Sequence, residues 1–184
     1  MLGDLAPGRI ILEVSSDTRI WRYEVTPNTG AVSELEPGIP QEGGSKHEIP
    51  VFATGEANCF FDGTEAKSPD DRFIAKCSGG YPGKPAEFRI TNADTKSTTY
   101  QWDKGDRQIL GFVWSPNSHS IGLLTSSQKR GNGPLELIWA LAGHPVPYVT
   151  VYLDFIGMDG TAPSEYQIKS NVLYGRARIL DWKR

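Results

Sequence analysis

Ser68-Pro69-Asp70-Asp71-Arg72-Phe73-Ile74-Ala75-Lys76-Cys77-Ser78 is the stretch that decides the fold. Pro69 presets the backbone angle of the first corner of a tight turn, and Asp70 tolerates the second corner. Beyond the turn, side chains alternate with a period of two, which is typical of a strand. We therefore predict a turn followed by a strand whose core-facing residues are Phe73, Ala75 and Cys77.

The same phrase recurs 47 residues further on, where Ser115 and Pro116 lead into Asn117-Ser118-His119-Ser120-Ile121-Gly122-Leu123-Leu124-Thr125. Later turns near Thr95 and His144 repeat at 49 residues. A period of about 40–50 residues with four short strands in each unit is the signature of a propeller blade. We predict a single all-β domain over residues 1–184, built of repeated four-stranded antiparallel units. These units cover residues 9–36 with 177–182, residues 57–102 and residues 109–154.

Both Ser-Pro phrases resemble the W-S-P-D-G-x-x-I-A motif of TolB-type β-propellers, a WD-like repeat class that the propeller domains of prolyl-oligopeptidase-like enzymes share. Trp21-Arg22-Tyr23-Glu24-Val25 leading to Thr29-Gly30 is similar to a hairpin of that family, and Ala177–Trp182 resembles the strand before its next Ser-Pro. The sequence departs from the motif where Lys67 replaces the usual Trp and where Asp71 or Ser118 replaces the turn Gly. The resemblance implies a propeller-like fold.

The chain ends suggest how such a fold closes. Pairing residues 177–182 with 9–15 would complete one unit from both termini. Three units are fewer than the four to eight blades of most propellers. Hence two chains could assemble into one ring, the chain could be part of a longer protein, or the segment 155–175 could add further strands. The alternative fold is a sandwich or a closed, lipocalin-like β-barrel of about eight to ten strands.

Composition excludes several classes of function. Lys and Arg number 19 against 22 Asp and Glu, a formal charge of −3 without a basic block, so nucleic acid is not an expected partner. No apolar run is long enough to span a bilayer, and the N-terminus lacks the pattern of a signal peptide. The sequence does not determine a cellular location, although it slightly favours the cytoplasm.

No motif predicts catalysis, a cofactor or a metal site. His47, His119 and His144 are far apart in sequence and are expected in surface loops or turns. Asp70-Asp71 belongs to the turn, and turn or cap roles are commoner than metal binding for Asp154 and Asp159. Cys59 and Cys77 are the only cysteines; two buried thiols are the favoured interpretation, with a disulfide as the alternative. We assign Trp21, Trp102, Trp114, Trp139 and Trp182 to the core over a sugar-binding role.

The predicted units also have two unlike ends. Longer loops gather at one of them: Ser15–Thr18, Gly79–Pro85, Ser127–Pro134 and residues 36–56, 103–108 and 155–175. Binding usually resides on the side with longer loops. The candidate partner-binding residues there are Tyr81, Lys84, Lys129 and Arg130, an aromatic ring and cations suited to an acidic partner.

Three functions are compatible with these patterns. The leading hypothesis is a non-catalytic binding module, a propeller-type scaffold for protein–protein interaction, with homo-oligomerisation as a way to complete the ring. The second is a β-barrel that binds a small apolar ligand. The third is the propeller portion of a hydrolase.

Overall fold

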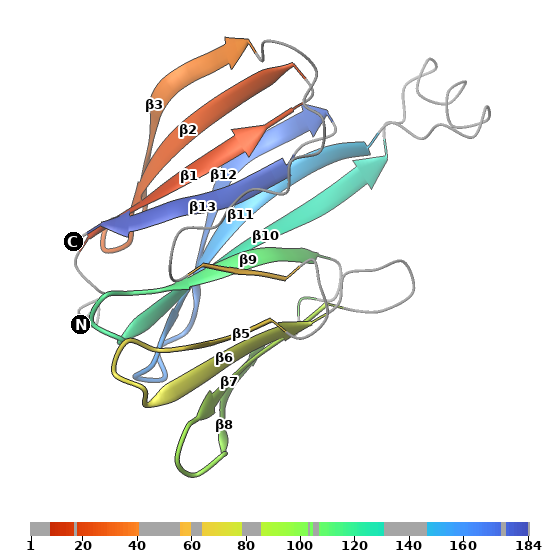
Figure 1. The fold of residues 1–184 in the computed structure, drawn as a ribbon. Coiled ribbons are helices and arrows are strands. Elements are labelled where there is room, and N and C mark those ends of the chain that lie inside the picture. The colour runs from red at the N-terminus through yellow and green to blue at the C-terminus, as the bar shows by residue number, and fades with distance from the viewer. Residues whose placement is uncertain are drawn as a thin grey trace.

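The protein is all-β. A computed structural model describes residues 8–16, 18–40, 56–59, 64–78, 86–102, 104, 107–130, 147–173 and 176–183. Within those ranges the chain forms three antiparallel sheets and no helix (Figure 1). These described strands do not close into a barrel, and the propeller-like and sandwich arrangements both stay predictions.

Three sheets account for all the strands. Sheet A has the order β13-β1-β2-β3 and contains β1 (Arg9–Ser15), β2 (Arg19–Thr26), β3 (Ala31–Pro40) and β13 (Arg176–Lys183). Sheet C has the order β5-β6-β7-β8 and contains β5 (Thr64–Lys67), β6 (Phe73–Ser78), β7 (Glu87–Asn92) and β8 (Thr98–Trp102). Sheet B has the order β12-β11-β10-β9-β4 and contains β4 (Glu56–Asn58), β9 (Gln108–Trp114), β10 (Ser120–Arg130), β11 (Pro147–Gly157) and β12 (Ser164–Leu173).

Sheet A is assembled from both ends of the chain. Strand β13 pairs antiparallel with β1 from Arg9 opposite Lys183 to Ser15 opposite Arg176. The predicted closure of the first unit by residues 177–182 is therefore confirmed. Alternation places Ile10, Leu12 and Val14 on one face, where all three are fully buried.

Sheet C contains the quoted stretch. Ala75 and Cys77 are fully buried and Phe73 is partly buried, whereas Lys76 is exposed, so the predicted core face is confirmed. The predicted unit over residues 57–102 begins later in the structure than residue 57. Its first strand is β5, and residues 56–58 form β4, which pairs with β9 of sheet B.

The third unit is longer than predicted. Strands β10 and β11 pair over their whole length, from Ser120 opposite Gly157 to Arg130 opposite Pro147. Residues 127–130 therefore belong to a strand and not to the predicted loop. Strand β11 continues to Gly157, and β12 adds a strand within the segment 155–175, as one of the alternatives for that segment expected. The predicted turn near His144 lies outside the described residues.

Sheet B is the middle layer of the three. One apolar core lies between sheets A and B and includes Leu12, Trp182 and Leu153. The other lies between sheets B and C and includes Phe88 and Phe112. Because both faces of sheet B are covered at its centre, β9 is buried from Gly111 to Trp114 and β11 from Leu153 to Ile156, whereas the edge strand β12 alternates.

The first Ser-Pro corner is closed by its own side chains. The amide of Ser68 donates to the carbonyl of Phe73 at 2.9 Å, and the amide of Asp71 donates to the carbonyl of Ser68 at 2.9 Å. The hydroxyl of Ser68 donates to Asp70 Oδ1 at 2.6 Å and accepts from the amide of Phe73 at 3.0 Å. Asp71 has a φ of 58°, in the left-handed region where the family motif has Gly.

The second corner repeats each of these bonds at equivalent positions. Ser115 N donates to Ser120 O at 2.9 Å, and the Ser115 hydroxyl donates to Asn117 Oδ1 at 2.8 Å. Ser118 has a φ of 63° and takes the place of Asp71. Its hydroxyl accepts a bond of 3.0 Å from the amide of Asp70. The sequence repeat is thus a structural repeat, and its two copies contact one another.

Candidate binding face

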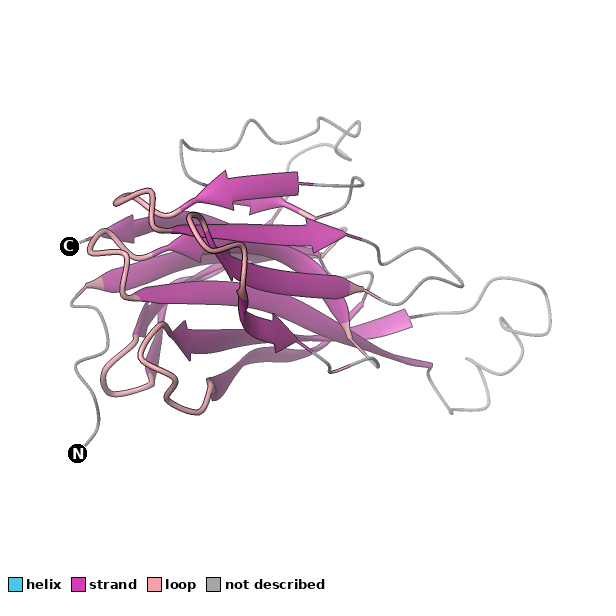
Figure 2. Ribbon diagram, turned by 90° about the horizontal axis from the view of Figure 1, so that it is seen from below, coloured by secondary structure: helices cyan, strands magenta, loops and turns pink. Residues whose placement is uncertain are grey.

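The sheets have two unlike ends. At one end, short turns join β2 to β3, β5 to β6, β7 to β8, β9 to β10 and β11 to β12. Figure 2 shows most of these turns, in pink, gathered at one side of the molecule. At the other end the chain leaves the sheets between β3 and β4, β6 and β7, and β10 and β11. The candidate binding face is defined by these strand ends. The prediction that residues 155–175 form a long loop on this side is wrong, because β12 occupies much of that segment and the turn from β11 to β12 lies at the other end.

The predicted partner-binding residues are only partly visible on this face. Tyr81 and Lys84 lie outside the described residues, between the end of β6 and the start of β7. Lys129 and Arg130 end strand β10, where their backbones pair with Tyr148 and Pro147. The structure therefore places two of the four on a strand end and does not test their grouping into one patch.

A cluster of four charged side chains is the most completely formed polar site among the described residues. Lys104 and Arg107 lie between β8 and β9, whereas Asp154 is on β11 and Glu165 is on β12. Lys104 Nζ donates to Asp154 Oδ1 at 2.8 Å and to Glu165 Oε2 at 2.5 Å. The guanidinium of Arg107 donates two hydrogen bonds, of 3.0 and 3.1 Å, to the two carboxylate oxygens of Glu165. This is the bidentate geometry that suits a guanidinium and a carboxylate.

Asp154 is the buried centre of this ionic cluster. Its side chain is only 1% exposed, and its second oxygen accepts from the Thr125 hydroxyl at 3.3 Å. The guanidinium of Arg107 also stacks 3.7 Å over the ring of Tyr152. A charge buried to this degree is tolerated only when it is paired and hydrogen-bonded, as Asp154 is here.

The pKa values of three groups in the ionic cluster move in the direction that favours the charged form. Hydrogen bonds from Arg107 and then Lys104 lower the pKa of Glu165 to about 2. Burial acts to lower the pKa of Lys104, but its hydrogen bonds to Asp154 and Glu165 outweigh burial and raise it. Burial also acts to lower the pKa of Arg107, but its hydrogen bonds to Glu165 outweigh burial and raise it. Lys104, Arg107 and Glu165 therefore stay charged near neutral pH.

The ionic cluster joins segments that are far apart in sequence. Its two cations meet two carboxylates. It fastens the β8–β9 connection, and hence the end of sheet C, to the outer strands of sheet B. Sequence reasoning missed it because Lys104 lies 50 residues from Asp154 and 61 from Glu165.

The side chain of Lys169 lies between sheets A and B. Lys169 of β12 is 4.9 Å from the ring centre of Trp21 and 5.8 Å from that of Tyr23, and its ammonium lies 3.8 Å from Glu34. The pKa of Tyr23 is raised mainly by burial. The negative charge of Glu34 and the hydrogen bond to it raise this pKa further. Lys169 points into this junction from a sheet-edge strand, an arrangement that discourages edge-to-edge aggregation.

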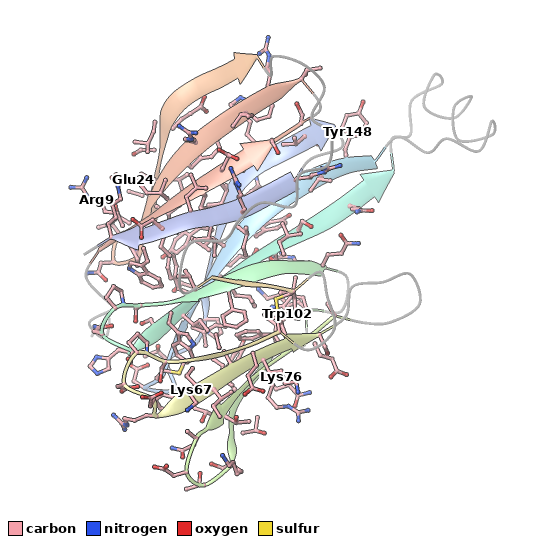
Figure 3. All side chains as sticks on the ribbon, in the orientation of Figure 1. Arg9, Glu24, Lys67, Lys76, Trp102 and Tyr148 are labelled. Carbon is pink, nitrogen blue, oxygen red and sulfur yellow. A yellow bond between two sulfur atoms is a disulfide. The ribbon has the colours of Figure 1, made fainter. Side chains whose placement is uncertain are left out.

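The remaining sequence assignments have mixed outcomes. Trp102, Trp114 and Trp182 are buried and Trp21 packs against the core, as predicted, whereas Trp139 is outside the described residues. Figure 3 shows Trp102 between sheets B and C. His119 is exposed in the second corner, as predicted, and His47 and His144 lie outside the described residues.

The carboxylates also differ from one another. Asp159 accepts the Thr161 amide at 3.0 Å in a turn, as predicted. Asp154 has no turn role, because it is buried in a strand and paired with Lys104. Among the described residues no three His, Cys, Asp or Glu side chains come together in a way that could hold a metal ion.

The cysteines correct the favoured interpretation of two free thiols. Cys59 and Cys77 form a disulfide across 18 residues of sequence, and both are fully buried. Cys59 follows β4, and its amide donates to the carbonyl of Leu110 at 3.4 Å. The bond therefore ties the β4 edge of sheet B to β6 of sheet C. Sequence alone missed this pairing because the two cysteines are brought together by sheets that only the fold stacks.

No family model, curated protein or solved structure matches the chain. No helix that is long and apolar enough to cross a membrane occurs in the ranges that the structure describes.

Proposed function

We propose that the chain is a non-catalytic, propeller-type scaffold that binds a protein partner at the end where its long connections leave the sheets. The observation that carries this proposal is the contrast between the ends. One end is closed by hydrogen-bonded corners, and the other presents the longer connections on a rigid frame. Loops positioned by a rigid scaffold are where binding residues concentrate.

Two further features support the propeller-type interpretation. Sheet A takes its fourth strand from the opposite chain terminus, which is how propeller rings are usually locked. The Ser-Pro corner recurs with the same bonds in neighbouring sheets. The ionic cluster also suits a scaffold, because its ion pairs hold the end of sheet C in place against sheet B.

Alanine substitution of charged and aromatic residues at the two ends tests the proposal. The tagged chain is used to capture and identify partners, and their Kd is then measured for two variants. One variant is Y81A/K84A/K129A/R130A at the loop end. Its matched control is K67A/R72A/K96A/H119A at the corner end, which also removes three cations and one ring. We expect at least a tenfold loss of affinity in the first variant and none in the second.

A partner that binds both variants as tightly as the parent chain would contradict the loop-end proposal. Loss of binding in the corner-end variant alone would place the function at the opposite end of the sheets. Circular dichroism and a thermal melt on both variants separate loss of binding from loss of folding.

Ring completion by a second copy remains a prediction, and the outer face of sheet C bears on it. Glu65, Lys76, Arg89 and Gln101 lie in one cross-strand row there, and all four are exposed. Such a polar face resembles the capping face of a repeat stack more than the apolar surface between sheets. Light scattering after size exclusion decides the question: a mass twice that of the chain favours the ring, and a monomer mass contradicts it.

A further inference from the structure

The disulfide lies at a structurally weak point. Strand β4 is only three residues long and pairs with β9 through Glu56 opposite Val113, Ala57 opposite Phe112 and Asn58 opposite Gly111. A three-residue strand at the edge of a sheet has few backbone bonds to hold it and opens at low cost. The next residue, Cys59, is bonded covalently to β6 of the neighbouring sheet.

The place of β4 in the chain shows what the disulfide connects. Strand β4 of sheet B stands in sequence between β3 of sheet A and β5 of sheet C, whereas β9 to β12 of sheet B follow sheet C. Strand β4 pairs with the outer edge of β9, and Cys59 comes directly after it. That edge belongs to the strand carrying Phe112, which is buried in the B–C core.

We propose that Cys59–Cys77 is a redox latch that holds β4 on the edge of β9 and so closes the B–C junction. In the oxidised chain the latch is shut. A dithiol reductant converts the disulfide to two thiols and is itself oxidised to a cyclic disulfide, so electrons and protons balance. In the reduced chain β4 leaves β9 and uncovers its edge, while the apolar core and the ionic cluster keep sheets B and C together.

Burial protects the disulfide from reductant while β4 stays paired with β9. Both cysteines have no exposed surface, so a reductant reaches the sulfur atoms only after β4 has opened. Reduction is therefore gated by β4, and its rate reaches a plateau at high dithiol concentration, where opening becomes limiting.

Hydrogen exchange followed by mass spectrometry tests the latch directly. Amide exchange is compared in the oxidised chain, in the same chain kept in dithiol and in C59A/C77A. We expect reduction to speed exchange at least tenfold in peptides covering residues 56–59 and 109–113 and to leave β1 and β2 of sheet A unchanged. C59A/C77A should match the reduced chain with or without dithiol. Equal exchange in the oxidised and reduced chains overturns the proposal, as does a uniform loss of protection across all three sheets.

The gate has a separate test that leaves both cysteines in place. Ala57→Pro removes a ladder amide from β4 and should speed reduction by dithiol at least tenfold, as read from alkylation of the released thiols. Ser33→Pro makes the same change in edge strand β3 of sheet A and should leave the rate unchanged. An unaltered rate in Ala57→Pro means that β4 is not the gate. A chain purified under air whose mass lacks the loss of two hydrogens means that there is no latch.

Discussion

The two junctions of sheet B are held in different ways. The A–B junction depends on apolar contact, with Phe155 and Trp182 meeting edge to face at 5.8 Å and Ile179 buried beside them. The B–C junction adds a disulfide, the ionic cluster and a bond of 3.2 Å from Trp114 Nε1 to the carbonyl of Ala66. Both have apolar cores, and Lys169 of sheet B lies 3.8 Å from Glu34 of sheet A. Among the described residues, however, only the B–C junction has a covalent cross-link.

The difference follows from how each outer sheet is built. Sheet A includes strands from both ends of the chain, so β13 already links it to sheet B through the short step from β12. Sheet C is one run of strands from β5 to β8, and the chain joins it to sheet B at both ends, from β4 before it and to β9 after it. The side-chain bonds of the B–C junction lie close to these two connections. Cys59 follows β4, and Lys104 and Arg107 lie between β8 and β9.

Removing the largest side chain of the A–B junction should have the largest effect. Trp182→Ala leaves a cavity beside Phe155, and such truncations cost about 3–5 kcal/mol of unfolding free energy. Urea denaturation followed by circular dichroism measures the loss. Lys183→Ala, an exposed neighbour, is the control and should change stability by less than about 0.5 kcal/mol. A loss below about 1 kcal/mol would mean that β13 does not carry the junction.

Removing the cross-link should be the next largest effect, and it should depend on redox conditions. C59A/C77A should lose about 3 kcal/mol relative to the oxidised parent, the value for a closed loop of similar length. In dithiol the parent and the variant should agree within about 0.5 kcal/mol, because neither has the bond. Equal stability under air would show that the disulfide does not constrain the chain.

Acid should weaken the B–C junction through Glu165. The pKa of this carboxyl is about 2 in the folded chain and 4.5 ordinarily, so its stabilising contribution is complete above pH 4.5. It is lost as the pH falls from 4.5 toward 2. Unfolding free energies at pH 7, 4.5, 3 and 2 should fall more steeply for the parent than for Glu165→Gln. Parallel curves would contradict this, and Glu65→Gln on the exposed face of sheet C is the matched control.

The smallest effect should separate the two Ser-Pro corners. Asp71→Gly relieves a left-handed residue whose side chain is exposed and should stabilise the protein by about 0.5–1 kcal/mol. Ser118→Gly relieves the same strain but removes the hydroxyl that accepts from Asp70 N, so the gain should be cancelled. Thermal melts compare the stabilities of the two variants. Equal gains in stability would show that the hydrogen bond between the corners does not contribute to stability.

Local patterns predicted much of the fold because they act over a few residues. The bounds of β1, the alternation of Ala75 and Cys77 and the Ser-Pro corners follow from turn chemistry and period-two spacing. The pairing of β13 with β1 was also predictable, because an incomplete unit at each terminus has one obvious partner. The candidate binding residues were chosen from loop composition, and Tyr81 and Lys84 remain predictions.

What the sequence determined by itself is the list of strands and corners, since these depend on neighbouring residues. Only the tertiary structure decided which sheet lies in the middle. Once sheet B separates A from C, residues 50 or more apart meet, Asp154 is buried against Lys104, and Cys59 reaches Cys77. No local spacing encodes these contacts, because they arise where one sheet packs on another and the free energy comes from burying surface that both sheets supply.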